Sequence, residues 1–123
     1  MAKIVFCEDD PTIQKLVRAA LRGSGHEIHI ASDGEEGLAL VRDIRPDLIF
    51  SDVSMPKLDG YQLGDALKAS PDTAGIPLVF VTASVQRSQV AEAERHGGAG
   101  VLPKPFTMAE LRERVAQLLK LED

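Results

Sequence analysis

The residues of this sequence whose types could do chemistry stand at the ends of short apolar runs. They are the carboxylates of Glu8, Asp9, Asp10 and Asp52, the hydroxyl of Thr82 and the ammonium of Lys104. Carboxylates that lie close together repel one another, and each tends to keep a proton unless a cation compensates its charge. Lys104 supplies one positive charge against at least three negative ones. Because oxygen ligands with retained waters suit Mg²⁺, we expect a bound Mg²⁺, for which Mn²⁺ could substitute.

Asp52 is the candidate nucleophile of this set. A carboxylate can attack an activated phosphoryl group and form an acyl phosphate, and catalysis of that reaction is mostly positioning and charge neutralisation. A metal ion and Lys104 would contact phosphoryl oxygens, and the Thr82 hydroxyl would donate to another. Each residue also has a plainer interpretation by itself, since acidic pairs at strand ends often cap helices. The hypothesis therefore depends on the fold bringing them together.

Short apolar runs alternate with helical patterns and predict the elements that would position these residues. The predicted strands are Lys3–Cys7, Glu27–Ala31, Asp47–Ser51, Pro77–Val81 and Gly100–Leu102. The runs Ile4–Cys7, Leu48–Phe50 and Leu78–Val81 are continuously apolar, as strands covered on both faces are. The second strand alternates polar and apolar residues, which favours an edge position with one wetter face.

Five helices are predicted between and after these strands. They cover about Pro11–Leu21, Glu35–Ile44, Gly60–Ala69, Ser88–His96 and Thr107–Leu121. Asp10 can cap the first helix and Pro11 fits its first position, whereas Thr107 and Glu110 have the spacing of a capping box. The helix at Ser88–His96 has a weak apolar face, so we expect it to be the mobile element of the fold.

Alternating strands and helices predict an α/β fold. We expect a flavodoxin-like, doubly wound parallel sheet of five strands in the order 2-1-3-4-5, with five helices on its two faces. In such sheets ligands bind beyond the carboxyl ends of the strands, at the point where the strand order reverses. The candidate residues all follow carboxyl ends, so they would meet at this edge.

Composition and charge narrow the functional classes. The 123 residues fit a single domain over 1–123. A net charge of −5 and the lack of a Lys/Arg-rich run argue against direct binding to nucleic acid or to an anionic membrane. Acidic residues follow the first apolar run too soon for a signal peptide, and Cys7 has no second cysteine to pair with. We therefore expect a cytoplasmic protein in which Cys7 is a small buried hydrophobe.

The chain resembles the receiver domains of two-component response regulators, and among them the single-domain chemotaxis regulator, over essentially its whole length. The matching stretches are Val5–Pro11, Pro46–Gly60, Pro77–Ala83 and Lys104–Phe106. The resemblance implies that Asp52 is the phosphoacceptor. It implies that Asp9 binds Mg²⁺ directly, that Glu8 binds it through water, and that Ser54 contributes its backbone carbonyl.

The same resemblance assigns the phosphate-binding residues. Thr82 would be the switch hydroxyl, with Ala83 beside it, and Lys104 would pair with the phosphate. The bond between Lys104 and Pro105 is expected to be cis. These roles follow from the family pattern and not from spacing by itself.

Two residues near the fifth strand depart from the family pattern. Members usually carry Tyr or Phe where this chain has Val101, and a valine cannot swing a ring between inward and outward rotamers. Pro103 removes a backbone donor at the end of the strand. We expect the phosphorylation chemistry to survive and another conformational change to replace that of the aromatic side chain. Our hypothesis is that the glycines of 97–100 give the region of the fourth helix the backbone freedom for it.

The leading functional hypothesis is a phosphorylation switch. The phosphohistidine of a sensor histidine kinase or histidine phosphotransfer protein would donate to Asp52, and the surface around the fourth helix, fifth strand and fifth helix would change. An unknown downstream target would bind there, and phosphorylation-linked dimerisation through this surface stays open. The last helix ends near Leu121, which fits either a stand-alone regulator or a receiver cut from a longer protein.

Two alternatives come from other functional classes. A Mg²⁺-dependent phosphohydrolase with an aspartate nucleophile typically has another Asp two residues later as general acid, and here that residue is Ser54. A pseudo-receiver would bind partners without phosphorylation, and Val101 is its best support. The histidines, His26, His29 and His96, lack metal-ligand spacing, so we expect surface or edge positions for them.

Overall fold

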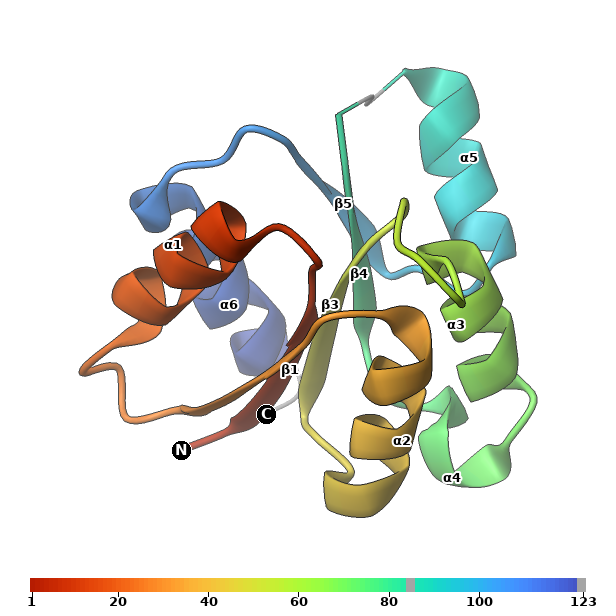
Figure 1. Cartoon of the computed structure of the whole chain (residues 1–123), viewed down its shortest axis with the longest axis horizontal. Helices are drawn as coiled ribbons and strands as arrows, with labels where there is room; N and C mark the ends of the chain where they lie inside the picture. Colours follow the sequence, from red (N-terminus) through yellow and green to blue (C-terminus); the bar gives the residue numbers. More distant parts are fainter. Residues whose placement is uncertain (84–85, 122–123) are drawn as a thin grey trace.

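Five parallel strands form one sheet in the order β2-β1-β3-β4-β5 (Figure 1). The computed structural model describes residues 1–83 and 86–121. The strands are β1 Lys3–Cys7, β2 Glu27–Ala31, β3 Leu48–Asp52, β4 Leu78–Thr82 and β5 Gly100–Pro103. The predicted strand order is therefore confirmed, with β2 at one edge and half-buried along most of its length.

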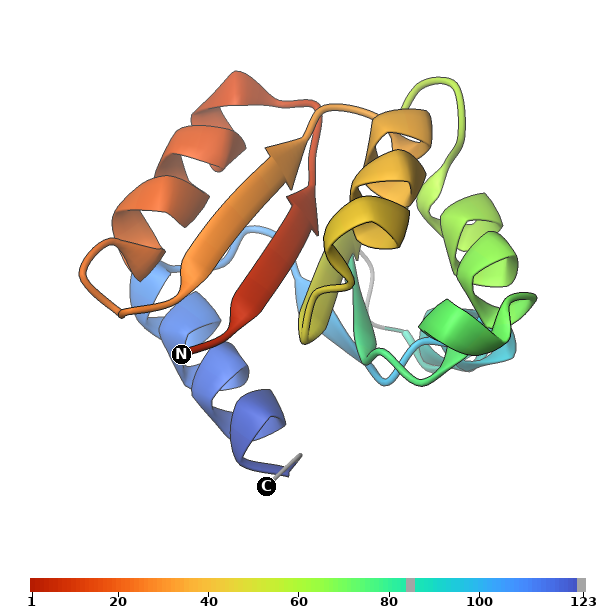
Figure 2. The same cartoon turned by 90° about the horizontal axis from the view of Figure 1, so that it is seen from below.

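Helices cover both faces of the sheet. They are α1 Pro11–Leu21, α2 Gly34–Ile44, α3 Gly60–Lys68, α4 Pro71–Ala74, α5 Arg87–Arg95 and α6 Met108–Leu121. Figure 2 shows α1 and α6 on one face and α2 and α3 on the other. The prediction of five helices is wrong by one, because the described chain also has the single-turn helix α4. Pro71 occupies its first turn after Ser70, where the missing N–H of proline costs no hydrogen bond.

The apolar side chains of alternate strand residues separate into two cores. Ile4, Phe6 and Phe50 point to the side covered by α1 and α6, whereas Val5 and Phe80 point to the side of α2, α3 and α5. This period of two is what a parallel sheet covered on both faces requires. Cys7 is also fully buried in the second core, as expected, and burial raises the pKa of its thiol to about 12.

Strands β3 and β4 each end one residue later than predicted. Parallel pairing extends far enough for Asp52 to lie opposite Val81 and for Thr82 to lie opposite Pro103. Asp52 and Thr82 are therefore the last residues of their strands and not the first residues of the following loops. The sheet ladder holds their backbones, which positions the two side chains more rigidly than a loop would.

Hydrogen-bonded caps begin the helices next to the candidate residues. The Asp10 carboxylate accepts a hydrogen bond from the Thr12 N–H at the start of α1. Thr107 and Glu110 form the predicted capping box before α6, with distances of 3.0 and 3.1 Å. These caps satisfy amide groups that the first helical turn leaves without a partner, and they mark where α1 and α6 begin after β1 and β5.

Candidate functional site

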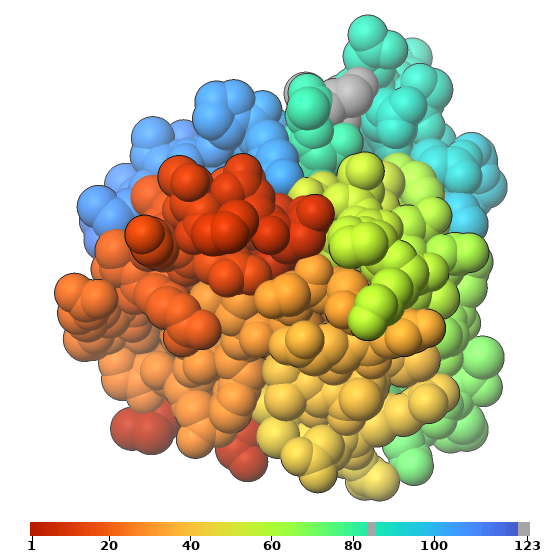
Figure 3. All heavy atoms as spheres, viewed as in Figure 1, coloured from red at the N-terminus to blue at the C-terminus, as the bar shows by residue number. Residues whose placement is uncertain are grey.

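A cleft of about 520 Å³ opens at the carboxyl ends of the strands, where the strand order reverses. It is lined by Glu8, Asp9, Asp10, Asp52, Val53, Ser54, Thr82, Ala83 and Lys104. Figure 3 shows the segment after β1, in red and orange, meeting the yellow-green segment after β3. Every residue predicted for the metal or the phosphate from the sequence is therefore brought to one place.

Lys104 is the cation of the cleft, and it contacts two carboxylates. Its Nζ donates a hydrogen bond of 2.6 Å to Asp52 Oδ2 and lies 3.0 Å from Glu8 Oε1. The second contact is an ion pair and not a hydrogen bond. Glu8 Oε1 has no hydrogen-bond partner among the described residues. Burial lowers the pKa of Lys104, but the hydrogen bond to Asp52 and the ion pair with Glu8 outweigh it, so the pKa is raised and the ammonium stays charged.

Glu8 is an acidic residue in an environment that disfavours its charge. The residue is fully buried, and its Oε2 accepts the Asp10 N–H at 3.0 Å. Burial raises the pKa of Glu8, although that N–H and the Lys104 ammonium act in the opposite direction, and the nearby Asp52 charge raises the pKa further. A second positive charge in the cleft would relieve this strain.

The donor set of the cleft fits a hard divalent cation. One carboxylate oxygen from each of Glu8, Asp9 and Asp52 lies within 4.8 Å of the others. Glu8 Oε1 is a buried oxygen without a hydrogen bond among the residues described, and Asp9 is exposed on the open side. Three carboxylates, with room for water in an open cleft, match the ligands that Mg²⁺ and similar ions take.

The other predicted residues lie at the rim of the cleft. The Ser54 N–H donates to Asp52 Oδ1 at 3.2 Å, which fixes the carboxylate plane; a metal contact by the Ser54 carbonyl stays a prediction. Thr82 is half-buried and Ala83 is exposed, and both line the cleft. The peptide bond between Lys104 and Pro105 is cis.

Sequence reasoning missed a glutamine that supports the acidic pair. Gln14 in α1 donates from Nε2 to the Glu8 carbonyl at 2.6 Å and lies 3.2 Å from Ser32 Oγ. It thereby links the end of β1 to the segment after β2. The signal available in the sequence was weak: a polar residue one helical turn after the Asp10 cap.

Val101, at the position where an aromatic residue was expected, lies on β5 opposite Phe80. It is half-buried and packs against the core on the α3 and α5 side. Its carbonyl accepts a hydrogen bond of 2.9 Å from Arg114 Nη1 of α6. The strand that carries this position is therefore tied to α6 through its backbone.

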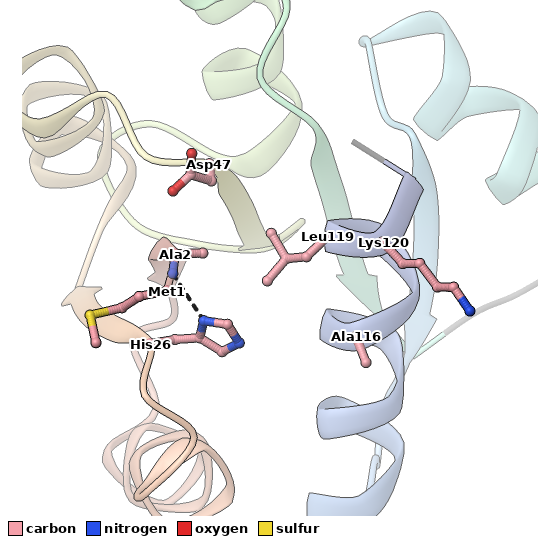
Figure 4. A pocket seen from close by; sticks show the side chains of 7 residues that line it. All are labelled: Met1, Ala2, His26, Asp47, Ala116, Leu119 and Lys120. Atoms are coloured by element: carbon pink, nitrogen blue, oxygen red, sulfur yellow. Dashed lines mark hydrogen bonds between the residues drawn. The ribbon is translucent and has the colours of Figure 1, made fainter. Parts of the chain in front are cut away.

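A second hollow, of about 420 Å³, lies near the amino ends of the strands, beside α6 (Figure 4). His26, Asp47 and Lys120 line it with apolar neighbours. The His26 Nδ1 already accepts the Ala2 N–H at 3.0 Å, and an Asp47 oxygen accepts the Lys3 N–H. His26 and Asp47 thus bind the backbone at the start of β1, so the acidic cleft remains the better candidate for chemistry.

The fold and the cleft define a doubly wound α/β domain with an acidic site at the carboxyl ends of its strands, and comparison with known proteins identifies its family. Residues 4–116 match the response regulator receiver domain. The chain belongs to that family, and it is a domain of two-component signal transduction that acts as a signalling switch.

Relatives of two lengths share the domain. The chain is 36% identical over 123 residues to the DNA-binding dual master transcriptional regulator RpaA of Synechocystis sp., covering all of this chain and 51% of RpaA. It is 32% identical to protein PilH of Pseudomonas aeruginosa, covering 97% of this chain and 98% of PilH. The chain thus spans about half the length of RpaA and nearly all of PilH.

Solved structures confirm the architecture. The chemotaxis response regulator CheY4 of Vibrio cholerae superposes with a TM-score of 0.91 at 30% identity, covering 96% of this chain and 98% of CheY4. The receiver domain of sensor histidine kinase PA1611 of Pseudomonas aeruginosa, solved with a magnesium ion coordinated in the active site cleft, gives 0.87 at 27% identity, covering 97% and 98%. Among the described residues, we find no helix long and apolar enough to cross a membrane.

Proposed function

We propose that Asp52 accepts a phosphoryl group from the phosphohistidine of a sensor histidine kinase or a histidine phosphotransfer protein, in a reaction that needs Mg²⁺. One observation carries the proposal: Asp52 ends a buried strand with Lys104 at 2.6 Å, inside a cleft that also holds Glu8 and Asp9. A nucleophile, a cation for the phosphoryl oxygens and a divalent-cation site are thereby combined.

The residues of the cleft divide the proposed transfer among them. An Asp52 oxygen forms the new P–O bond while the P–N bond to the donor imidazole breaks, and the electron pair of that bond returns to the imidazole nitrogen. Lys104 exchanges its carboxylate partner for a phosphoryl oxygen, and the Thr82 hydroxyl donates to another. Glu8, Asp9, Asp52 and the Ser54 carbonyl would hold the cation, which would neutralise phosphoryl charge.

An apolar hollow beside the cleft supports a protein as the donor. It measures about 290 Å³ and is lined by Ile13 and Leu16 of α1 together with Ala83, Lys104, Pro105 and Phe106. Apolar side chains next to a reactive centre are typical of protein contacts. A donor protein that covers them would bring its phosphohistidine over Asp52.

The proposal includes an output surface formed by α5, β5 and α6. Helix α5 buries little of its surface, and β5 carries Val101 opposite Phe80 of β4. A downstream target protein binds this surface in the phosphorylated state, and a second copy of the chain is the other partner we propose there. Because Val101 has no ring to reorient, the change at Thr82 reaches this surface through movement of the backbone.

We place the domain in the cytoplasm, without direct contact to nucleic acid or membrane.

The test is the intact mass of the chain after incubation with acetyl phosphate. Wild type, Asp52→Asn and, as a control on an exposed carboxylate, Asp43→Asn are compared with Mg²⁺ and with EDTA. We expect one phosphoryl adduct that needs the metal, persists in Asp43→Asn and disappears in Asp52→Asn. A folded, metal-bound wild type without an adduct would favour a pseudo-receiver, and multiple turnover of small phosphomonoesters would favour a phosphohydrolase.

A further inference from the structure

His96, the residue that follows α5, links α5 to α3 through both nitrogens of its ring. Its Nδ1 lies 2.7 Å from Asp65 Oδ1 of α3, and its Nε2 lies 2.9 Å from Glu92 Oε1 of α5. The ring also stacks on Tyr61 of α3, with centroids 4.5 Å apart and planes at 20°. This cluster lies outside the acidic cleft, and none of its residues is needed for the phosphoryl chemistry.

The two carboxylate contacts require a protonated ring. A neutral imidazole carries one N–H, so one of its nitrogens would present a lone pair to a carboxylate, whereas the imidazolium donates from both. The position just after α5 favours positive charge as well, because helix carbonyls without partners point toward it. The hydrogen bonds to Asp65 and Glu92 raise the pKa of His96 above its ordinary value of 6.5, outweighing a small effect of burial.

The charges around the His96 ring make the net charge of the cluster depend on whether the ring is protonated. Asp65 and Glu92 contribute two negative charges, and Arg95 pairs with Glu92 and contributes one positive charge. Lys68, the other charged group on the α3 side, directs its Nζ away to the Ala74 carbonyl at 2.6 Å. With the imidazolium the group of four charges sums to zero, and with the neutral ring it carries one net negative charge.

Helix α5 packs on β5 and buries few of its residues. Of its nine residues, all of which the structure describes, Ala93 is the buried one. The backbone of His96 approaches α3 closely at Gly64, where an added Cβ would lie 2.4 Å from the His96 carbonyl oxygen. Figure 1 shows α5 beside α3, at the end of the sheet that carries β5. The contacts of His96 with Asp65 and Tyr61 are thus side-chain links between the end of this helix and α3.

We propose that His96 is a pH-dependent clasp that holds helix α5 against α3 when protonated and releases it when neutral. The clasp is present below the ordinary pKa of 6.5 and is lost as the pH rises through the raised pKa of the folded state. It controls the position of α5 in the chain without a phosphoryl group, so it does not depend on the phosphotransfer proposed above. A shift of cytoplasmic pH would then alter the α5 surface directly.

The test combines two NMR measurements on the unphosphorylated chain. The His96 ring signals give its pKa, which we expect above 6.5. Amide exchange in α5, corrected for the intrinsic effect of pH, should speed up severalfold between about pH 5.5 and pH 8.5, because the neutral ring no longer pairs with Asp65. Amides of α1 serve as the internal reference and should not show this change.

Variants separate the clasp from a general effect of pH. His96→Gln should make α5 exchange independent of pH, and Asp65→Asn, which leaves the pair with Glu92 inside α5, should weaken the pH dependence. His29→Gln, which alters a half-buried histidine paired with Glu27 on β2, should behave as wild type. Either single variant suffices if the other fails to fold. A His96 pKa at or below 6.5, or a pH dependence of α5 that persists in His96→Gln, would overturn the proposal.

Discussion

Replacing Lys104 by methionine leaves two buried carboxylates without the cation they share. The side chains of Glu8 and Asp52 are 1% and 9% exposed, and the ammonium lies 3.0 and 2.6 Å from their oxygens. Methionine preserves most of the aliphatic stem of the lysine, so the change removes charge more than volume. The expected result is a loss of stability that depends on pH.

The size of this loss of stability is limited by the least costly way in which the variant can respond to the missing charge, which is to protonate Glu8. Its ordinary pKa is 4.5, and holding the carboxyl protonated at pH 7 costs at most about 3.4 kcal/mol, at about 1.36 kcal/mol for each pKa unit. Burial already raises the pKa of Glu8, which lowers this limit. We expect Lys104→Met to destabilise the metal-free domain by about 2–3 kcal/mol, near the lower end of what removing one partner of a buried pair costs.

The sign of the pH dependence is fixed by the direction of the pKa shift. In the variant, the pKa of Glu8 is higher in the folded state than in the unfolded state. Glu8 therefore does not destabilise the fold below about pH 4.5, and its destabilising effect grows as the pH rises toward its folded-state pKa. At pH 5 the same limit is about 0.7 kcal/mol. The loss of stability should therefore be several times larger at pH 7 than at pH 5.

The assay is urea unfolding followed by far-UV circular dichroism, since the sequence has no tryptophan. EDTA keeps divalent cations from replacing the ammonium. Lys57→Met is the control: its lysine is 61% exposed and lies 3.6 Å from Asp33, so it should cost less than about 1 kcal/mol at either pH. A Lys104→Met variant within about 0.5 kcal/mol of wild type at pH 7, or equally destabilised at both pH values, would refute the reasoning.

Three further predictions concern the scaffold. Gly34→Ala places a Cβ 1.9 Å from the Leu58 carbonyl oxygen and should cost about 2–3 kcal/mol in urea unfolding, whereas Gly75→Ala, with open space around it, should stay within about 0.5 kcal/mol. Asp10→Ala removes the α1 cap and should cost about 1 kcal/mol by the same measurement. His96→Gln should lose more stability at about pH 6 than at pH 8.5, because the raised pKa of His96 stabilises the fold only while the ring is charged; equal losses at both pH values would contradict this.

The strand order and the convergence of the cleft residues could be predicted because both depend on local pattern. Apolar runs at regular intervals define parallel strands, and in a doubly wound sheet the residues at their carboxyl ends must share an edge. Asp52 and Lys104 are 52 positions apart, yet each is placed by the end of its own strand. No long-range information was needed.

What the sequence did not reveal depends on contacts between distant elements. His96 was expected simply at a surface or edge, and its partner Asp65 is 31 positions away on another helix. The Gln14 contact with the Glu8 carbonyl likewise depends on how α1 packs over β1. Helix α4 is a different case, since Ser70 followed by Pro71 is a helix-start signal in a segment too short for a hydrophobic period.

The most direct test of the central claim locates the phosphoryl group. The chain is phosphorylated by acetyl phosphate in the presence of Mg²⁺, the acyl phosphate is reduced with borohydride, and the peptides are examined by mass spectrometry. We predict homoserine in place of aspartate at position 52 and nowhere else, and none when EDTA replaces the metal. Reduction at Asp9 or Asp10 instead, or an unmodified Asp52 in a folded and metal-bound domain, would contradict the assignment.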